Sequence, residues 1–354
     1  MRVGIVGGAQ LLAVGRLGRI HQLGHERFKR VAQLLRARAQ GEVHRVLRDR
    51  RTGAGGSARP STAFVECGML STSALTEIRT RERTWTRMTG VELSSPGEGV
   101  LQITFARPAS LNALNLEAVQ DLLAVLDEVD RRVDTRAVIL TGAGRAFCAG
   151  FDLTGYGDDE RLSEQGLTRG LISRQSQITD SLVRLHELPV PVVAAINGPC
   201  AGAGLSYTLA CDIRIAAAGA VFSAAFLRAG FTACDLGASW LLPRIVGVGR
   251  AHELMLTARR FDAPEALRIG LVTDVVPADQ LIERALGIAG QIKQHPPLST
   301  LLSKQGMAVG LQMPSLRASI EFENRQQVLS AMTEDQQEAA RSFLEKRPPQ
   351  YANR

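Results

Sequence analysis

The sequence contains no run of 18 or more apolar residues, which is the length that a membrane-spanning helix needs, so we expect no membrane partner. Its five cysteines form no CxxC pair and no cluster with histidine, which argues against a zinc site or a disulfide framework and favours a reducing compartment such as the cytoplasm. Aromatic residues make up only 5% of the chain, which by itself excludes no class of protein. A VGIVGG run at Val3 to Gly8 lacks the GxGxxG spacing and a following βαβ unit, so it does not indicate a dinucleotide site.

Positive charge is concentrated at the start of the chain. Residues 1–87 hold 17 Lys and Arg against 6 Asp and Glu, whereas residues 88–354 hold 25 against 29, so the overall charge of +7 comes from the first segment alone. This segment shows little periodicity and a Gly/Ser/Ala tract, and we interpret it as a basic, disordered extension. Two alternatives stay open: an organelle transit sequence, or an upstream extension of a protein whose translation begins at Met88.

Regular patterns follow this extension and alternate between strand and helix. Strands are predicted at Val100 to Phe105, at Ala137 to Leu140 and at Val192 to Ile196. Helices are predicted from an N-cap at Asn115, and between about Leu167 and Leu188. The alternation predicts an α/β fold.

Two of these strands lead into loops of small residues. AFCAGFDL follows the strand at 137, and NGPCAGAG follows the strand at 192. Small residues let a ligand approach the main chain, and a helix that begins near Ala203 would direct free N–H groups and its positive dipole end at that ligand. The pair therefore predicts a site that stabilises an oxygen acquiring negative charge.

The two loops together resemble those of the enoyl-CoA hydratase/isomerase (crotonase) family. Further matches are RPASLNAL from Arg107, ACDIR from Ala210, WLLPRIVG from Trp240 and FLEKR from Phe343. The resemblance implies a right-handed spiral of β-β-α repeats over residues 95–275, followed by a helical C-terminal trimerisation region over residues 276–350. It also implies a homotrimer or hexamer that acts on acyl-CoA.

The same resemblance assigns roles to individual residues. The backbone N–H groups of Phe151 and Ala203 would form the oxyanion hole for the thioester oxygen of the substrate. Coenzyme A would enter as part of the substrate, with no metal and no other cofactor. The residues implied in binding it are Arg107, Ala109, Arg145, Ala149, Lys304, Phe343 and Lys346.

The acid/base residues of typical hydratases in this family are missing. The two expected glutamates fall at Ser206 and Phe226, neither of which can act as a strong base alone. The segment ACDLG resembles the one in which family isomerases carry a catalytic aspartate, which makes Asp235 the candidate base. Its alternative role is as N-cap of a helix starting near Gly237.

We therefore predict an enoyl- or dienoyl-CoA double-bond isomerase. The alternatives are an enoyl-CoA hydratase with non-standard acid/base residues, which would be a lyase, and a CoA-binding pseudoenzyme. An RNA-binding relative is a weaker alternative, because the basic charge lies in the extension and we expect no nucleic-acid partner. Among the remaining polar residues, Asp152 is predicted to cap the turn after the first loop, and Asp212 and Arg214 to form a structural pair.

Overall fold

The computed structural model describes residues 89–154 and 166–354. The predictions made for residues 1–87 and for a start at Met88 lie outside the described residues. None of the described helices combines the length and the apolar content that crossing a membrane requires.

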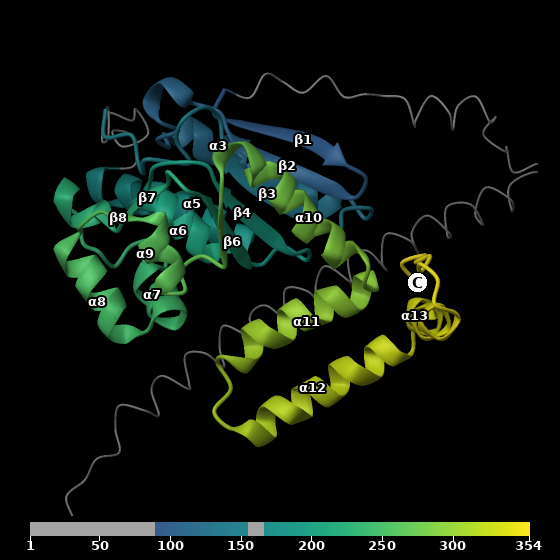
Figure 1. The fold of residues 1–354 in the computed structure, drawn as a ribbon. Helices are drawn as coiled ribbons and strands as arrows, with labels where there is room; N and C mark the ends of the chain where they lie inside the picture. Colours follow the sequence, from purple (N-terminus) through teal and green to yellow (C-terminus); the bar gives the residue numbers. More distant parts are fainter. Residues whose placement is uncertain (1–88, 155–165) are drawn as a thin grey trace, which may run out of the picture. The chain divides into compact units, whose positions relative to one another are not determined.

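A six-stranded sheet forms the centre of the fold (Figure 1). Its strand order is β1-β2-β3-β4-β6-β9, and every neighbouring pair is parallel except the β1–β2 hairpin. The strands are β1 (Val91–Gly97), β2 (Val100–Phe105), β3 (Ala137–Gly142), β4 (Val192–Ile196), β6 (Ile213–Ala217) and β9 (Asp274–Val276). A second, three-stranded sheet consists of β5 (Cys200–Ala201), β7 (Val221–Ser223) and β8 (Phe261–Asp262).

The central strands are buried on both faces, which explains why β3 and β4 are continuous apolar runs. Alternate residues of each strand belong to two different cores. Ile139 and Val193 face helix α10 (Leu281–Lys293), whereas Leu140 and Ala194 face the larger core with helices α3 (Leu116–Arg131) and α5 (Leu167–His186).

The predicted helix starts are confirmed. The Asn115 side chain accepts a hydrogen bond of 2.9 Å from the backbone N–H of Ala118, and α3 then runs for 16 residues. The helix predicted between 167 and 188 is α5, which ends at His186. The remaining helices of the core are α6 (Ala203–Ala210), α7 (Ala238–Val246), α8 (Val248–Thr257) and α9 (Ala263–Arg268), with short 3-10 turns η1 (Pro108–Ser110), η2 (Ala225–Ala229) and η3 (Ala278–Gln280).

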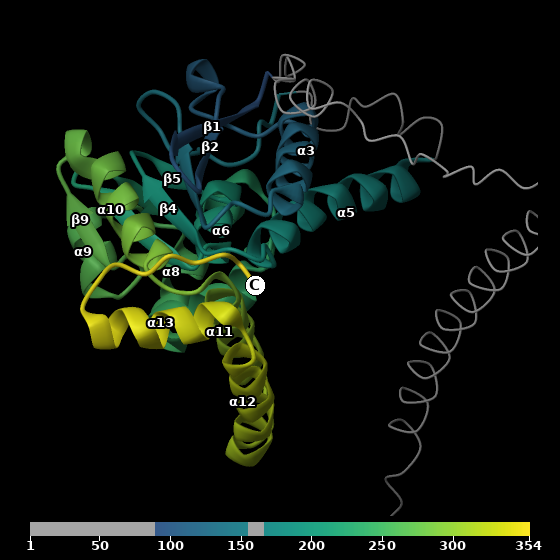
Figure 2. The same ribbon diagram turned by 90° about the vertical axis from the view of Figure 1, so that its right-hand side faces the viewer.

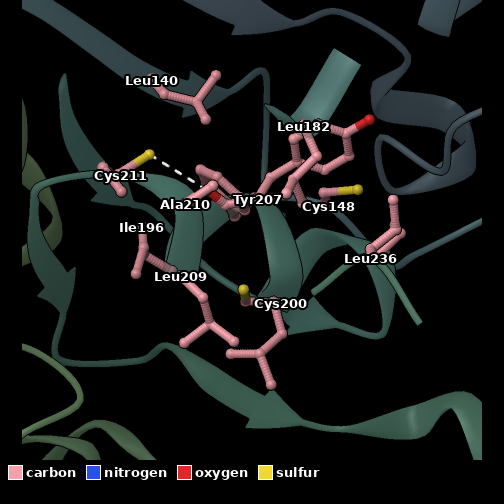
Figure 3. Close-up of a cluster of buried hydrophobic side chains, with 14 of the residues drawn as sticks. Leu140, Cys148, Leu182, Ile196, Cys200, Tyr207, Leu209, Ala210, Cys211 and Leu236 are labelled. Atoms are coloured by element: carbon pink, nitrogen blue, oxygen red, sulfur yellow. Dashed lines mark hydrogen bonds between the residues drawn. The ribbon is translucent and has the colours of Figure 1, made fainter. Parts of the chain in front are cut away.

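Helix α6 lies in the middle of the core, with all eight of its residues buried. Tyr207 on α6 is surrounded by apolar side chains and thiols (Figure 3), and its hydroxyl is 2.5 Å from the Ser181 hydroxyl of α5. Burial raises the pKa of the thiols of Cys148 and Cys211 to about 12 and raises the pKa of the Cys200 thiol well above 9.0. These cysteines are therefore packing residues of the core.

The C-terminal region is helical, as predicted. After α10 come α11 (Pro297–Gly310), α12 (Leu316–Ala331) and α13 (Glu334–Glu345). Helix α12 packs beside α11 (Figures 1 and 2). All residues of α12 are at least partly exposed, and Leu316 is 76% exposed.

The sheet includes a strand that the sequence pattern does not predict. This strand, β1, starts at Val91, and a bulge between Ser94 and Gly97 breaks its alternation. One prediction about the fold needs correction. Asp212 and Arg214 do not pair with each other. Asp212 accepts from Lys304 and the Val192 N–H, whereas Arg214 donates to backbone carbonyls that include Leu271.

Candidate active site

A cavity of about 540 Å³ lies where the two glycine loops meet. Its wall is mainly apolar, and its polar side chains come from α5, from η2 and from the segment that leads into α7. The described residues that line it are Ala149, Gly150, Phe151, Leu153, Gln175, Gly202, Ala203, Ala225, Phe226, Arg228, Ala229, Phe231, Thr232, Cys234 and Asp235.

The first loop is held so that the Phe151 N–H remains free. Gly150 accepts a hydrogen bond of 2.8 Å from the Leu114 N–H, and Asp152 donates one of 2.9 Å to the Leu114 carbonyl. The Phe151 N–H between them has no acceptor among the described residues. The Asn112 side chain supports the base of the loop by donating to the Ala146 carbonyl at 2.7 Å.

The second loop leads directly into α6. Ala201 donates to the Cys148 carbonyl at 3.0 Å, which ties this loop to the first one. Ala203 is the first residue of α6, so its N–H has no partner within the helix. A β-carbon placed on Gly150 would lie 3.7 Å from the Ala203 nitrogen, so the two loops are in contact.

Phe151 and Ala203 are therefore brought together as predicted, with both residues on the cavity wall and neither N–H used within the described chain. An N–H donor at the N-terminus of α6 and a second donor from the first loop, both in a largely apolar cavity, suit an oxygen that becomes negatively charged. The arrangement can stabilise an enolate.

The two positions that hold glutamate in typical hydratases cannot transfer protons in this cavity. Ser206 is fully buried in α6 and is not among the residues that line the cavity; its hydroxyl has no hydrogen-bond partner among the described residues. Phe226 does line the cavity, and its aromatic ring carries no ionisable group.

Asp235 is the one carboxylate among the described residues that line the cavity. Its Oδ1 accepts hydrogen bonds from Gln175 Nε2 at 2.7 Å and from the Leu236 N–H at 2.8 Å. The alternative role of Asp235 as a helix N-cap is wrong, because α7 begins at Ala238 with Gly237 as its N-cap. No short pattern in the sequence indicates Gln175 as a partner of Asp235, since 60 residues separate the two.

Comparison with known proteins shows the family of the chain. The sequence profile of a family described as "Enoyl-CoA hydratase/isomerase" matches residues 96–354. The chain belongs to the enoyl-CoA hydratase/isomerase family. It is therefore an enzyme of acyl-CoA metabolism by family, and the crotonase fold that the sequence predicted is confirmed by the solved structures it matches.

Some curated relatives in this family are named as hydratases and others as isomerases. A probable enoyl-CoA hydratase of Mycobacterium tuberculosis is 36% identical over 266 residues, covering 74% of this chain and 93% of that protein. The 1,2-epoxyphenylacetyl-CoA isomerase of Escherichia coli is 35% identical over 263 residues, which cover 74% of this chain and 98% of that protein. A crystal structure of an enoyl-CoA hydratase from Bacillus anthracis matches with a TM-score of 0.69 and 34% identity over 75% of this chain and all of that one.

The residues that family resemblance assigns to CoA near the first loop lie in three settings. Arg107 forms an ion pair of 2.9 Å with Asp152, and the Asp152 carboxylate also accepts from the Thr154 N–H, as predicted for a residue that caps this turn. These bonds hold the pKa of Asp152 below its usual value. Ala109 and Arg145 are exposed, whereas Ala149 lines the cavity.

The three residues assigned to CoA in the tail are not among those that line the cavity. Phe343 and Lys346 are exposed at the end of α13. Lys304 is buried, and its ammonium contacts the Asp212 carboxylate at 2.8 Å and the Val190 carbonyl at 3.0 Å. A cation already paired inside the protein is poorly placed to bind phosphate, so the structure gives Lys304 a structural position.

Proposed function

We propose that this enzyme shifts a carbon–carbon double bond within an enoyl-CoA, with Asp235 as its single acid/base. The observation that supports the proposal is the cavity itself: among the described residues that line it, Asp235 is the one carboxylate, and two backbone N–H groups have no acceptor within the described chain. Oδ2 of Asp235 accepts no hydrogen bond from any described residue, so this atom is available to move a proton.

The reaction can be written with these groups alone. Oδ2 takes a proton from the α-carbon of a β,γ-enoyl thioester, and the C–H electrons form a double bond to the thioester carbon while the carbonyl π electrons move onto oxygen. The N–H groups of Phe151 and Ala203 stabilise this dienolate oxygen. When the electrons return, the γ-carbon takes the proton from Asp235, and the double bond lies between the α- and β-carbons.

Energetically, the oxyanion hole would supply the larger share of the rate. Removing one donor of this kind costs about 3 to 4 kcal/mol of transition-state stabilisation, and a positioned acid/base contributes about 10²- to 10⁴-fold. The reaction requires no redox cofactor, since no electrons leave the substrate, and the two backbone N–H groups supply the stabilisation of the enolate oxygen that a Lewis acid would otherwise give.

Water addition is the alternative, and the names of the hydratase relatives favour it. Addition of water needs one group to activate the water and a proton source for the α-carbon. With Phe226 and Ser206 at the usual glutamate positions, Asp235 would have to serve both needs. This is the reason for preferring the isomerase.

We further propose that CoA binds along the first loop, where it would contact Arg107, Ala109, Arg145 and Ala149. We also propose that the protein forms a homotrimer or hexamer, in which Phe343 and Lys346 contact the CoA bound to a neighbouring copy. Support comes from apolar side chains exposed on the C-terminal helices, where Leu316, Met332, Phe343 and Leu344 are each more than three-quarters exposed. Such a surface is suited to contact with another subunit.

The decisive variant is Asp235→Asn, measured with β,γ-enoyl-CoA substrates of several chain lengths. Asn keeps the shape and the hydrogen bonds to Oδ1 but cannot accept a proton, so we expect a loss of about 10²-fold or more in kcat. Asp262→Asn is the matched control, because Asp262 is an exposed helix N-cap that asparagine replaces equally well. Unchanged turnover in Asp235→Asn would remove Asp235 as the base.

Two further results would redirect the assignment. Efficient hydration of crotonyl-CoA by the unmodified protein would favour the hydratase. Binding of acyl-CoA thioesters with no turnover across the panel would indicate a pseudoenzyme.

A further inference from the structure

The Asp235 carboxylate is held on one side only. Oδ1 receives two hydrogen bonds, one from the side chain of Gln175 on α5 and one from the N–H of Leu236, the next residue in the chain. The Gln175 bond is 2.7 Å long and joins two elements that are 60 residues apart. Gln175 also lines the cavity, so it contacts the space where the acyl group would lie.

We propose that Gln175 is a positioning residue that sets the direction of the Asp235 carboxylate and leaves Oδ2 facing the acyl chain. The inference rests on the proposed function, since it concerns the same carboxylate. Two donors on one oxygen fix the plane of a carboxylate and leave the lone pairs of the other oxygen for a reacting proton.

The backbone beside Asp235 cannot do this alone. Leu236 has a φ of +44°, in the left-handed region that is unfavourable for a residue other than glycine. The Leu236 side chain is buried in the core (Figure 3), which holds the residue in this conformation and aims its N–H at Oδ1. One such bond still lets the carboxylate rotate about it, whereas the bond from Gln175 removes that freedom.

The consequence for the reaction is that a single oxygen both takes and returns the proton. In a planar dienolate the α- and γ-carbons each present a π lobe to the same face, so one well-placed Oδ2 on that face can reach both. A rotating carboxylate would spend part of its time with the proton directed away from the γ-carbon. Gln175 therefore favours completion of the double-bond shift over release of the unchanged substrate.

The test replaces Gln175 by methionine, which keeps the length of the side chain and removes the donor. We expect kcat for the double-bond shift to fall about tenfold, the value of one hydrogen bond to a charged group, with KM within about twofold. Gln177→Met is the matched control, because Gln177 is on the same helix and is not among the residues that line the cavity.

The double variant distinguishes positioning from a direct contact with the substrate. If Gln175 acts through Asp235, adding Gln175→Met to Asp235→Asn should lower the residual rate no further. A further tenfold loss in that background would overturn the inference. If the methionine variant does not fold, Gln175→Ala serves in its place, with the thermal midpoint measured for each.

The outcomes separate this inference from the function on which it rests. If Asp235→Asn retains full turnover, the proposed function fails and this inference with it. If Asp235→Asn is inactive while Gln175→Met keeps both kcat and KM within threefold of the parent, the inference alone fails.

Discussion

Replacing Gly150 by alanine should disable the oxyanion hole without touching any side chain that moves protons. Gly150 has a φ of +110°, a conformation that L-residues other than glycine rarely adopt. The added β-carbon would lie 3.2 Å from the Ala201 carbonyl oxygen and 3.7 Å from the Ala203 nitrogen. The first contact is too tight, so one of the two loops has to move by a few tenths of an ångström.

The size of the effect follows from what these loops hold. Loss of one properly aimed donor costs about 3 kcal/mol in the transition state, which corresponds to about a 10²-fold fall in kcat. The strained backbone should also lower the free energy of unfolding by about 1 to 2 kcal/mol. Binding of a saturated acyl-CoA, which develops no enolate, should change much less than kcat.

The assay compares Gly150→Ala with Gly219→Ala. A β-carbon added at Gly219 would have no neighbouring atom within 4 Å, and Gly219 has no left-handed φ, so alanine fits there. We would measure kcat, the dissociation constant of butyryl-CoA and the urea midpoint for both variants. If Gly150→Ala shows the expected loss of stability but keeps kcat within threefold of the parent, the two loops do not form the hole and the reasoning is refuted.

Three other predictions concern the buried polar groups. Lys304→Met should lower the free energy of unfolding by about 3 kcal/mol, because it leaves the Asp212 carboxylate without its cationic partner. The KM for acyl-CoA should not change. A raised KM at unchanged stability would mean that Lys304 binds CoA. The thiols of Cys148 and Cys211 have folded-state pKa values raised from 9.0 to about 12, so their stabilising contribution is complete below pH 9 and is lost as the pH rises from there toward 12. The free energy of unfolding should fall by about 1.4 kcal/mol per pH unit per thiol in that range. Urea unfolding between pH 8 and pH 10.5 measures this slope, and a flat profile contradicts the prediction. In the folded protein at pH 8, a thiol reagent should label Cys234, which is exposed, and leave the buried thiols unmodified until the protein is unfolded in urea. Mass spectrometry of the labelled peptides measures this. Labelling of the buried thiols in the folded protein would disprove their packing role.

Sequence reasoning located those parts of the fold that depend on neighbouring residues. Asn115 caps the helix that follows it through a bond to the residue three positions later, so the pattern is visible in a short window. The strand β1 was missed because Pro96 and the bulge before Gly97 interrupt its alternation. Its existence depends on pairing with β2, which a short window does not contain.

The candidate site also contains residues that a short sequence pattern indicates and others that only the fold brings together. Phe151 and Ala203 could be placed because each directly follows a glycine in a recognisable loop, and the structure puts both on one cavity wall. The partner of Asp235 could not be found, since Gln175 looks like any polar residue of an amphipathic helix until the fold brings the two together. Lys304 was assigned to CoA as a cation of the tail, and only the packing of α11 shows that its charge is used inside the protein.

The contact between α6 and the first loop has an implication for how activity can diverge in this scaffold. A β-carbon at Gly204 would lie 2.2 Å from the Cys148 carbonyl oxygen, so the helix and the loop touch through bare backbone and the spacing of the two donors is fixed by main-chain geometry. In the proposed reaction the acid/base group is Asp235, a side chain in the segment from Phe226 to Asp235, whose cavity-lining residues can be exchanged one by one. Exchanging that segment between relatives should therefore transfer the type of reaction. The enolate would still form, and the step that follows its formation would change.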